Sequence, residues 1–140
     1  MWRCSPTGFS TWETPVHRAG AESIAGQSLG GLAALHAAQQ APDLVGLALA
    51  QSASLNWVTD ADAATAALPA AQEASTTGGV RYFLEVGRHE PTLLEPNRRL
   101  HRALRDAGAD VVYREFQGGH DYTCWRGGLA DGLLALLGGA

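Results

Sequence analysis

The sequence predicts an α/β protein in which strands alternate with helices and form a mostly parallel sheet. Stretches expected to form strands occur at residues 22–26, 45–51, 81–86 and 111–116, with helix-forming runs between them. A helix between two strands returns the chain to the end of the sheet at which the first strand began, so the two strands run in the same direction. Residues 45–50 are almost continuously apolar, which is typical of a strand buried on both faces. We therefore expect about four strands flanked by helices on both sides.

The first half of the chain predicts a strand, a turn, a helix and a second strand. The first strand ends at Gly26, and a long helix-forming run at residues 29–40 follows. Pro42 ends this helix because proline has no backbone N–H and its ring clashes with the preceding turn. After the strand at residues 45–51 the chain is rich in Ala, Thr, Asp and Asn, which predicts a loop with one alanine-rich helix at about residues 62–74.

The second half repeats the strand and helix pattern twice. A strand at residues 81–86 leads through a polar loop to a helix from about residue 96 to 107, with arginines on its solvent side. We expect Gly108 to end this helix in the left-handed conformation that glycine adopts easily. The strand at residues 111–116 leads to a last helix at residues 125–137, whose leucines form one apolar stripe.

Two segments differ in character. Residues 1–21 contain prolines, glycines and two tryptophans without a sustained period, so we expect them to be irregular, and they lack the pattern of a signal peptide. Regular patterning begins at residue 22 and continues to the end. The sequence therefore predicts an irregular segment over residues 1–21 and one domain over residues 22–140.

The composition is that of a globular domain. The 140 residues include 46% hydrophobic and 17% charged residues and carry a formal net charge of −4, which excludes a disordered chain. Because the net charge is negative, no positive field would attract phosphate backbones, and we expect no nucleic-acid partner. The sequence contains no run of about 18 apolar residues, which is the length needed to cross a membrane, so we expect no membrane partner either.

Cysteine and lysine usage narrows the chemistry further. The two cysteines, Cys4 and Cys124, are too few for a disulfide scaffold and have no partner pair for a zinc site. We therefore expect no metal and a reducing, cytoplasmic location. All 10 basic residues are arginine, which excludes mechanisms that need a lysine, such as Walker-type phosphate binding and Schiff-base chemistry. We expect no cofactor.

Residues 26–30 read GQSLG and lie between the first expected strand and the first helix. In a G-x-S-x-G nucleophile elbow the serine occupies a strained turn, and the glycines let strand and helix approach closely. This makes Ser28 the candidate nucleophile. Chance alone would produce the pattern in roughly one such chain in ten, so its position between strand and helix carries the prediction. The alternative is a glycine-rich turn that binds an anion.

A serine nucleophile needs a base within hydrogen-bonding distance. Of the 5 histidines, His17 lies in the irregular start, His36 and His101 lie within expected helices, and His89 lies in the loop after the third strand. His120 follows the last strand directly and is preceded by two glycines, so we identify it as the candidate base. The alternative is a loop histidine exposed to water.

The carboxylate that would orient the base is expected in the loop after the third strand. Glu90 lies there and completes the chain order serine, acid, histidine that is typical of α/β-hydrolases. Two alternatives remain open: Glu85, which lies in the strand and would need a reason to be buried, and Glu95, which is suited to cap the following helix. We expect Asp121 to stabilise the start of the final helix.

The oxyanion hole of such an enzyme needs two hydrogen-bond donors. The backbone N–H of Leu29, immediately after the candidate nucleophile, is expected to be one of them. Its partner should come from a loop after an earlier strand, and no such strand is recognisable before residue 22.

Several stretches carry a family resemblance. They are AGQSLGGL at residues 25–32, QS at 51–52, LEVG at 84–87, and above all GGHD at 118–121 followed by CWRGGL at 124–129. Together they resemble the enterochelin (ferric enterobactin) esterases, of the esterase D-like type of α/β-hydrolases, over about residues 22–137. The elbow is shared by many hydrolases, whereas the last block is specific. The resemblance implies a hydrolase that cleaves ester bonds of a catecholate siderophore so that iron is released in the cytoplasm.

The resemblance also implies roles for particular residues. Carried over by position, Ser28 is the nucleophile and His120 the general base. Trp57, Trp125 and Arg126 match family positions near the site, where an aromatic wall and a cation would suit an anionic aromatic substrate. For Trp125 and Arg126 the alternative is packing and capping at the start of the last helix.

The chain departs from the family before the elbow, where family members carry several strands and helices. We therefore expect residues 22–140 to be the C-terminal portion of an α/β-hydrolase catalytic domain that is truncated at its N-terminus. The leading hypothesis is a serine esterase of the enterochelin esterase type. The alternative is a catalytically impaired fragment that acts as a binding or assembly module and self-associates through an exposed sheet edge. A phosphate-binding module is disfavoured because G-x-G-x-x-G spacing is absent.

Overall fold

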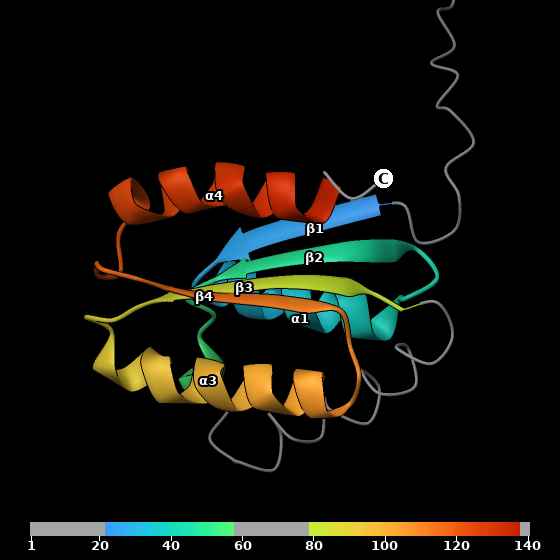
Figure 1. Cartoon of the computed structure of the whole chain (residues 1–140), viewed down its shortest axis with the longest axis horizontal. Helices are drawn as coiled ribbons and strands as arrows, with labels where there is room; N and C mark the ends of the chain where they lie inside the picture. Colours follow the sequence, from blue (N-terminus) through green and yellow to red (C-terminus); the bar gives the residue numbers. More distant parts are fainter. Residues whose placement is uncertain (1–21, 58–78, 138–140) are drawn as a thin grey trace, which may run out of the picture.

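Four parallel strands form the centre of the molecule (Figure 1). The computed structural model describes residues 22–57 and 79–137. The expected irregular segment at residues 1–21 and the expected helix at residues 62–74 lie outside these ranges. Every neighbouring pair of strands is parallel, which confirms the α/β class and the mostly parallel sheet. The strands lie in chain order across the sheet: β1 (Glu22–Gln27), β2 (Val45–Gln51), β3 (Arg81–Gly87) and β4 (Val111–Phe116).

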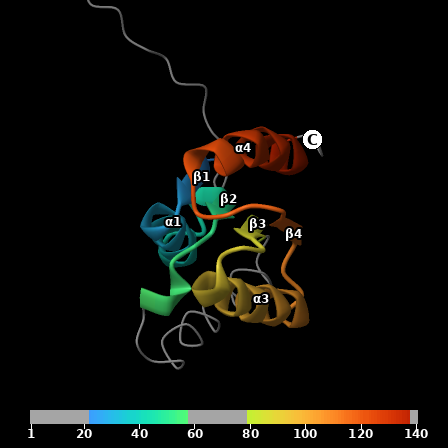
Figure 2. The same cartoon turned by 90° about the vertical axis from the view of Figure 1, so that its left-hand side faces the viewer.

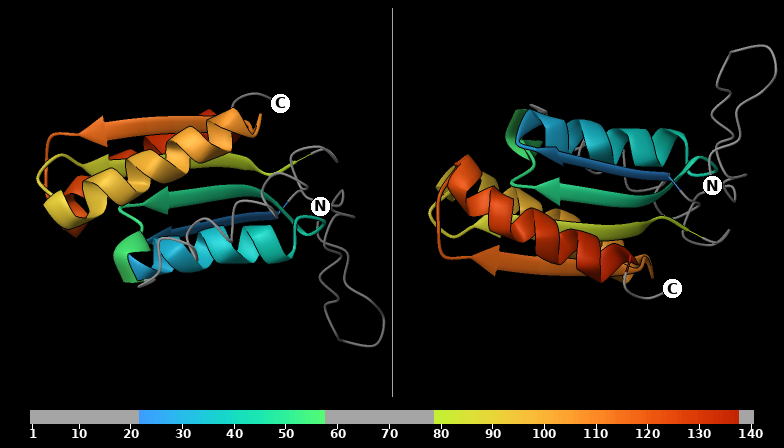
Figure 3. Two further views of the ribbon diagram at one scale, coloured as in Figure 1. Left: turned by 90° about the horizontal axis from the view of Figure 1, so that it is seen from below. Right: turned by 90° about the horizontal axis from the view of Figure 1, so that it is seen from above.

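Helices cover both faces of the sheet (Figures 1 and 2). The helix α1 (Leu29–Gln40) connects β1 to β2, and α3 (Pro91–Asp106) connects β3 to β4. Right-handed crossovers in the same direction along a sheet place their helices on the same face. Accordingly, α1 and α3 lie on one face and α4 (Tyr122–Leu137) crosses the other, as the two views of Figure 3 show. A short 3-10 helix, η1 (Leu55–Trp57), follows β2.

The core has one layer on each face of the sheet. Along β3, Tyr82 and Leu84 belong to the cluster that includes residues of α1 and α3, while Phe83 belongs to the cluster under α4. The strand β2 alternates in the same way between Ala48 and Leu49. Both central strands are therefore buried on both faces, as the apolar run of the second strand predicts.

Two helices begin earlier than the sequence predicts. The helix α3 begins at Pro91 instead of about residue 96, because proline has a backbone angle suited to the first helical position and needs no N–H there. Pro96 lies inside this helix. The helix α4 begins at Tyr122 instead of residue 125, because the Asp121 carboxylate accepts a hydrogen bond from the Cys124 N–H at 3.0 Å. The left-handed cap expected after α3 is present, with Gly108 at φ 79°.

The parallel register brings the carboxyl ends of all strands to one edge of the sheet. Gln27 pairs with Gln51, Gln51 pairs with Glu85, and Gly87 pairs with Phe116. The loops that follow these strands must therefore meet at this edge. In the described part of the chain, no helix is both long and apolar enough to cross a membrane.

An ion-pair cluster fastens α3 to the end of β4. Arg98 donates to both carboxylate oxygens of Glu115, at 2.7 and 3.0 Å, and the Tyr113 hydroxyl donates to the same group at 3.0 Å. The Arg88 Nε lies 3.5 Å from the Oε2 of Glu115. The hydrogen bonds, chiefly those from Arg98, lower the pKa of Glu115 to about 2.

This pKa makes the contribution of Glu115 to stability dependent on pH. The pKa is lower in the folded chain than in the unfolded chain, so the stabilisation is present above the ordinary carboxyl pKa and is lost as the pH falls toward 2. We expect Glu115→Gln to lower the free energy of unfolding near neutral pH and to have a progressively smaller effect in acid. Urea unfolding of both proteins at several pH values measures this difference. A difference that stays constant into acid would contradict the prediction.

Candidate active site

Ser28 occupies a strained turn between β1 and α1. Its backbone angles are φ 56° and ψ −121°, a region that residues with a side chain rarely adopt. The Ser28 N–H donates to the Gln51 carbonyl at 2.9 Å, and the Ser28 carbonyl accepts from the Ser54 N–H at 3.1 Å. Hydrogen bonds to the last residue of β2 and to the loop after it therefore hold the backbone of this turn in its strained form.

The two glycines of the GQSLG motif have different roles. A Cβ atom on Gly26 would lie 2.1 Å from the Gly30 carbonyl oxygen, so here the backbones of strand and helix are in direct contact. A Cβ atom on Gly30 would meet nothing within 4 Å. The close approach therefore requires a glycine only at position 26.

Three loops bring a hydroxyl, an imidazole and a carboxylate together. The Ser28 Oγ lies 2.9 Å from the His120 Nε2, and the His120 Nδ1 lies 2.5 Å from the Glu90 Oε1. Glu90 precedes α3 and its side chain is 2% exposed, whereas the imidazole is 41% exposed. A carboxylate accepts a hydrogen bond from the N–H at Nδ1, which leaves the lone pair of Nε2 free to accept the serine proton.

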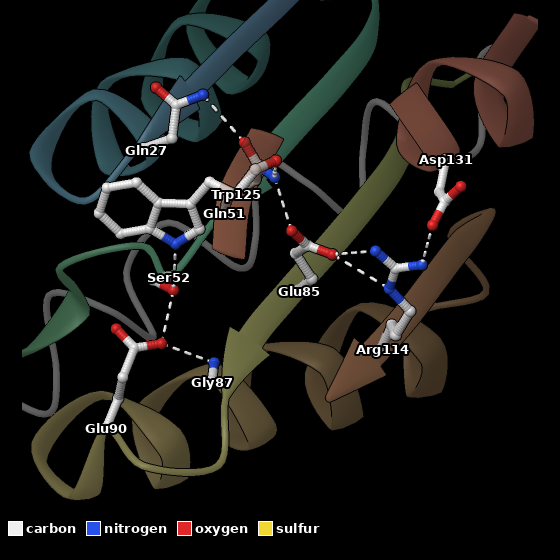
Figure 4. Close-up of polar contacts among 9 residues, drawn as sticks. All are labelled: Gln27, Gln51, Ser52, Glu85, Gly87, Glu90, Arg114, Trp125 and Asp131. Atoms are coloured by element: carbon white, nitrogen blue, oxygen red, sulfur yellow. Dashed lines mark hydrogen bonds and ion pairs between the residues drawn. The ribbon is translucent and has the colours of Figure 1, made fainter. Parts of the chain in front are cut away.

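The second oxygen of Glu90 is also held. The Glu90 Oε2 accepts hydrogen bonds from the Gly87 N–H and from the Ser52 hydroxyl, each at 2.6 Å (Figure 4). These two donors and the imidazole fix the direction in which the carboxylate faces. The arrangement therefore supplies an oriented anion behind His120.

The two alternative acids have other partners. Glu85 is fully buried, and its reason for burial is Arg114, which donates to it at 2.6 and 3.0 Å on the far side of β3 from Glu90 (Figure 4). Glu95 lies inside α3 instead of capping it, and it pairs with Arg102 at 2.7 Å on the surface. The hydrogen bond from Arg102 lowers the pKa of Glu95. Of the three glutamates, Glu90 is the one hydrogen bonded to His120.

A cavity of about 480 Å³ opens over Ser28 and His120. Its wall includes Ser54 and Asn56, which follow β2, and the loop that contains His89. The Ser54 hydroxyl lies 3.1 Å from the Ser28 hydroxyl. No sequence pattern singles out Ser54 or Asn56, although both lie in the loop after the second strand, where the topology directs side chains to this edge.

Leu29 lies at the start of α1, next to Ser28, and its side chain is exposed. The first amides of a helix have no acceptor within the helix and point along its positive end. The Leu29 N–H is therefore available to a negatively charged oxygen near the serine hydroxyl.

The residues expected to bind substrate are distributed differently. Trp125 is buried, donates from its indole N–H to the Ser52 hydroxyl at 2.9 Å and packs edge-on against His120, outside the cavity wall. This position favours packing over an exposed aromatic wall. Arg126 is exposed, lies outside the cavity wall and forms no ion pair within residues 22–57 and 79–137. Trp57 ends η1, but its side chain lies outside the described part of the structure.

Asp121 has the structural role that the sequence predicts. Its carboxylate accepts the Cys124 N–H at the start of α4, and this hydrogen bond lowers the pKa of Asp121. Among the described residues, no group of three His, Cys, Asp or Glu side chains is arranged to hold a metal ion.

The two glycines of the motif provide a matched test of the turn. We expect Gly26→Ala to lower the free energy of unfolding by about 1–3 kcal/mol or more, because the new methyl group overlaps a backbone carbonyl. Gly30→Ala should be neutral or stabilising by up to about 1 kcal/mol, since alanine favours the helix and meets open space. Chemical denaturation of both variants measures the difference. Equal effects would contradict the close contact of strand and helix.

Comparison with known proteins places the chain among esterases. Residues 10–136 match the family model described as Putative esterase. The chain is 40% identical over 127 residues to an iron(III) enterobactin esterase of Dickeya dadantii and 37% identical over 121 residues to one of Escherichia coli K12. The two alignments cover 83% and 85% of this chain. The chain spans only 29% and 30% of the length of these relatives.

Solved structures agree with the sequence comparison. The enterobactin esterase from Shigella flexneri, crystallised in the presence of enterobactin, superposes with a TM-score of 0.74 and 39% identity. The match covers 85% of this chain and 31% of that one. An S-formylglutathione hydrolase from Staphylococcus aureus, with 16% identity and a TM-score of 0.65, shares the fold alone. Since the family model matches most of its length, the chain belongs to the Putative esterase family.

Proposed function

We propose that this chain carries the reactive residues of a serine esterase that hydrolyses the ester bonds of a catecholate siderophore. One observation carries the proposal: Ser28, His120 and Glu90 come from three separate loops and form a continuous hydrogen-bonded series. The names of the relatives support the substrate class, since they are esterases of iron(III) enterobactin and iron(III) salmochelin. The cavity over the serine has a volume typical of small-molecule sites.

The proposed reaction begins when the Ser28 Oγ attacks the ester carbonyl carbon. The serine proton passes to the Nε2 of His120, while Glu90 accepts a hydrogen bond from Nδ1 and stabilises the imidazolium. The Leu29 N–H donates to the oxygen that becomes negative. The intermediate collapses, and the alcohol leaves with the proton from Nε2. Water then hydrolyses the acyl-enzyme with the same histidine as base.

The proton arrangement around Ser28 follows from its two partners. If Ser28 donates to the Nε2 of His120, its oxygen can only accept from Ser54, which lies 3.1 Å away. Ser54 then helps to hold the Ser28 hydroxyl with its proton directed at the imidazole. This orientation supports transfer of the proton during attack.

A second candidate function is a binding or assembly module without catalysis. It is favoured by the position of β1 at the end of the described sheet, where one edge of the strand pairs with no other described strand. Such an edge can add a strand of another chain. This candidate predicts self-association and no reaction with a serine-directed probe.

Ser28→Ala tests the nucleophile. We expect the unmodified chain to react with a fluorophosphonate probe and to hydrolyse a short p-nitrophenyl ester. The variant should lose both activities by a factor of about 10³ or more, because no other hydroxyl among the described residues has the imidazole as its partner. Hydrolysis should decline in acid, since a protonated imidazole cannot accept the serine proton. The same turnover in both proteins would exclude Ser28 as nucleophile and favour the assembly module.

Two glutamate variants test the acid. In Glu90→Gln the amide can donate to Nδ1 and favours the histidine tautomer with its proton on Nε2, so we expect kcat to fall by about 10⁴. Glu95→Gln is the matched control on the exposed side of α3 and should keep its activity. Steady-state hydrolysis of the p-nitrophenyl ester measures both. A similar loss in the two variants would argue against Glu90 as the acid.

A further inference from the structure

We propose that Ser52 is a positioning residue for Glu90 and that Trp125 sets the direction of the Ser52 hydroxyl. The proposal rests on the proposed function, in which Glu90 orients His120. Neither Ser52 nor Trp125 would touch the substrate. Together they would fix the angle at which the carboxylate meets the imidazole.

Ser52 lies between the indole of Trp125 and the carboxylate of Glu90 (Figure 4). Its side chain is fully buried, and its hydroxyl oxygen is 2.6 Å from the Glu90 Oε2 and 2.9 Å from the Trp125 Nε1. Ser52 follows β2, Glu90 lies between β3 and α3, and Trp125 lies in α4. The hydroxyl therefore connects three elements at the edge of the sheet that holds the site.

The chemistry of the partners fixes the direction of the hydrogen bonds. An indole N–H can only donate, so the Ser52 oxygen must accept from Trp125. A hydroxyl has a single proton, and that proton is then directed at the ionised Glu90. Trp125 thus removes the freedom of the hydroxyl to rotate away from the carboxylate.

The backbone of Ser52 also indicates that the hydroxyl is held in place. Its φ angle is 48°, in the left-handed region that favours glycine, and its N–H donates to the Glu85 carbonyl at 2.7 Å. Positive φ in a buried residue with a side chain persists only where the surroundings impose it. Glycine would relieve this strain but would lack the hydroxyl.

The second contact of Trp125 strengthens the argument. Its ring lies edge-on to the His120 ring, with 4.7 Å between centroids, and its carbonyl accepts from the Gln51 amide at 2.7 Å. One residue therefore packs against the imidazole and orients the hydroxyl that holds the acid. Loss of the Ser52 hydroxyl would leave the Gly87 N–H as the partner of Oε2, and the carboxylate could turn about it.

The experiment compares Ser52→Ala, Ser52→Gly and Trp125→Phe with the unmodified chain. Ser52→Gly removes the hydroxyl while it relieves the backbone strain, so it remains informative if the alanine variant folds poorly. We expect kcat for the p-nitrophenyl ester to fall by about 10–100-fold in each, with little change in KM, because a misaligned group loses rate and not binding. Titration with the fluorophosphonate probe corrects each rate for the fraction of active protein. Ser23→Ala, an exposed serine in β1, is the control.

Nuclear magnetic resonance gives a readout that does not depend on turnover. In the unmodified chain the Nδ1 proton of His120 should give a low-field signal, because it is held against the buried Glu90. We expect this signal to weaken or disappear in both Ser52 variants. Trp125→Phe should add no further loss of kcat when combined with Ser52→Gly, since phenylalanine keeps an aromatic ring beside His120 and the hydroxyl that the indole orients is already absent.

The outcomes separate this proposal from the proposed function. If the corrected kcat and the Nδ1 signal of both Ser52 variants match those of the unmodified chain, the proposal is overturned. It is also overturned if the unmodified chain gives no such signal, or if kcat falls only in proportion to the folded fraction. If the chain lacks esterase activity but both Ser52 variants lose the signal, the positioning role holds and the proposed function fails.

Discussion

The shared edge at the carboxyl ends of four parallel strands is the constraint on which the site depends. Ser28 follows β1, Ser52 and Ser54 follow β2, Glu90 follows β3 and His120 follows β4. The parallel register places these strand ends next to one another, so residues far apart in sequence meet without a long loop. The crossovers through α1 and α3 give the strands that they connect the same direction, because each helix returns the chain to the amino end of the sheet before the next strand starts.

Two buried glutamates at this edge show how partners decide the role of a carboxylate. Glu85 faces the Arg114 guanidinium and the Gln51 amide, and Arg114 also pairs with Asp131 of α4 at 2.6 Å (Figure 4). A buried charge needs such a partner, and this pair ties β3 and β4 to α4. Glu90 instead has neutral donors on one oxygen and the imidazole on the other. Its charge is therefore left to act on His120.

The start of α4 contacts both the sheet and the candidate site. Trp125 accepts a hydrogen bond from Gln51 at its carbonyl, donates one to Ser52 from its indole and packs against the imidazole. One turn before Trp125, the Asp121 carboxylate caps the first residues of α4. A single helical turn thus sets the position of the tryptophan relative to both the sheet and the histidine.

The sequence by itself determined the strands and their parallel direction, because hydrophobic periodicity and the alternation of strands with helices are local signals. It also identified Ser28, His120 and three glutamates as candidates, through the GQSLG pattern and the order of residues along the chain. Only the tertiary structure decided among the glutamates. Glu85 and Glu90 are both buried, and the choice depends on which one faces Arg114 and which one faces His120. Likewise, the burial of Trp125 follows from the packing of α4 on the sheet. Contacts between distant segments depend on the directions of side chains in space, which no pattern along the chain records.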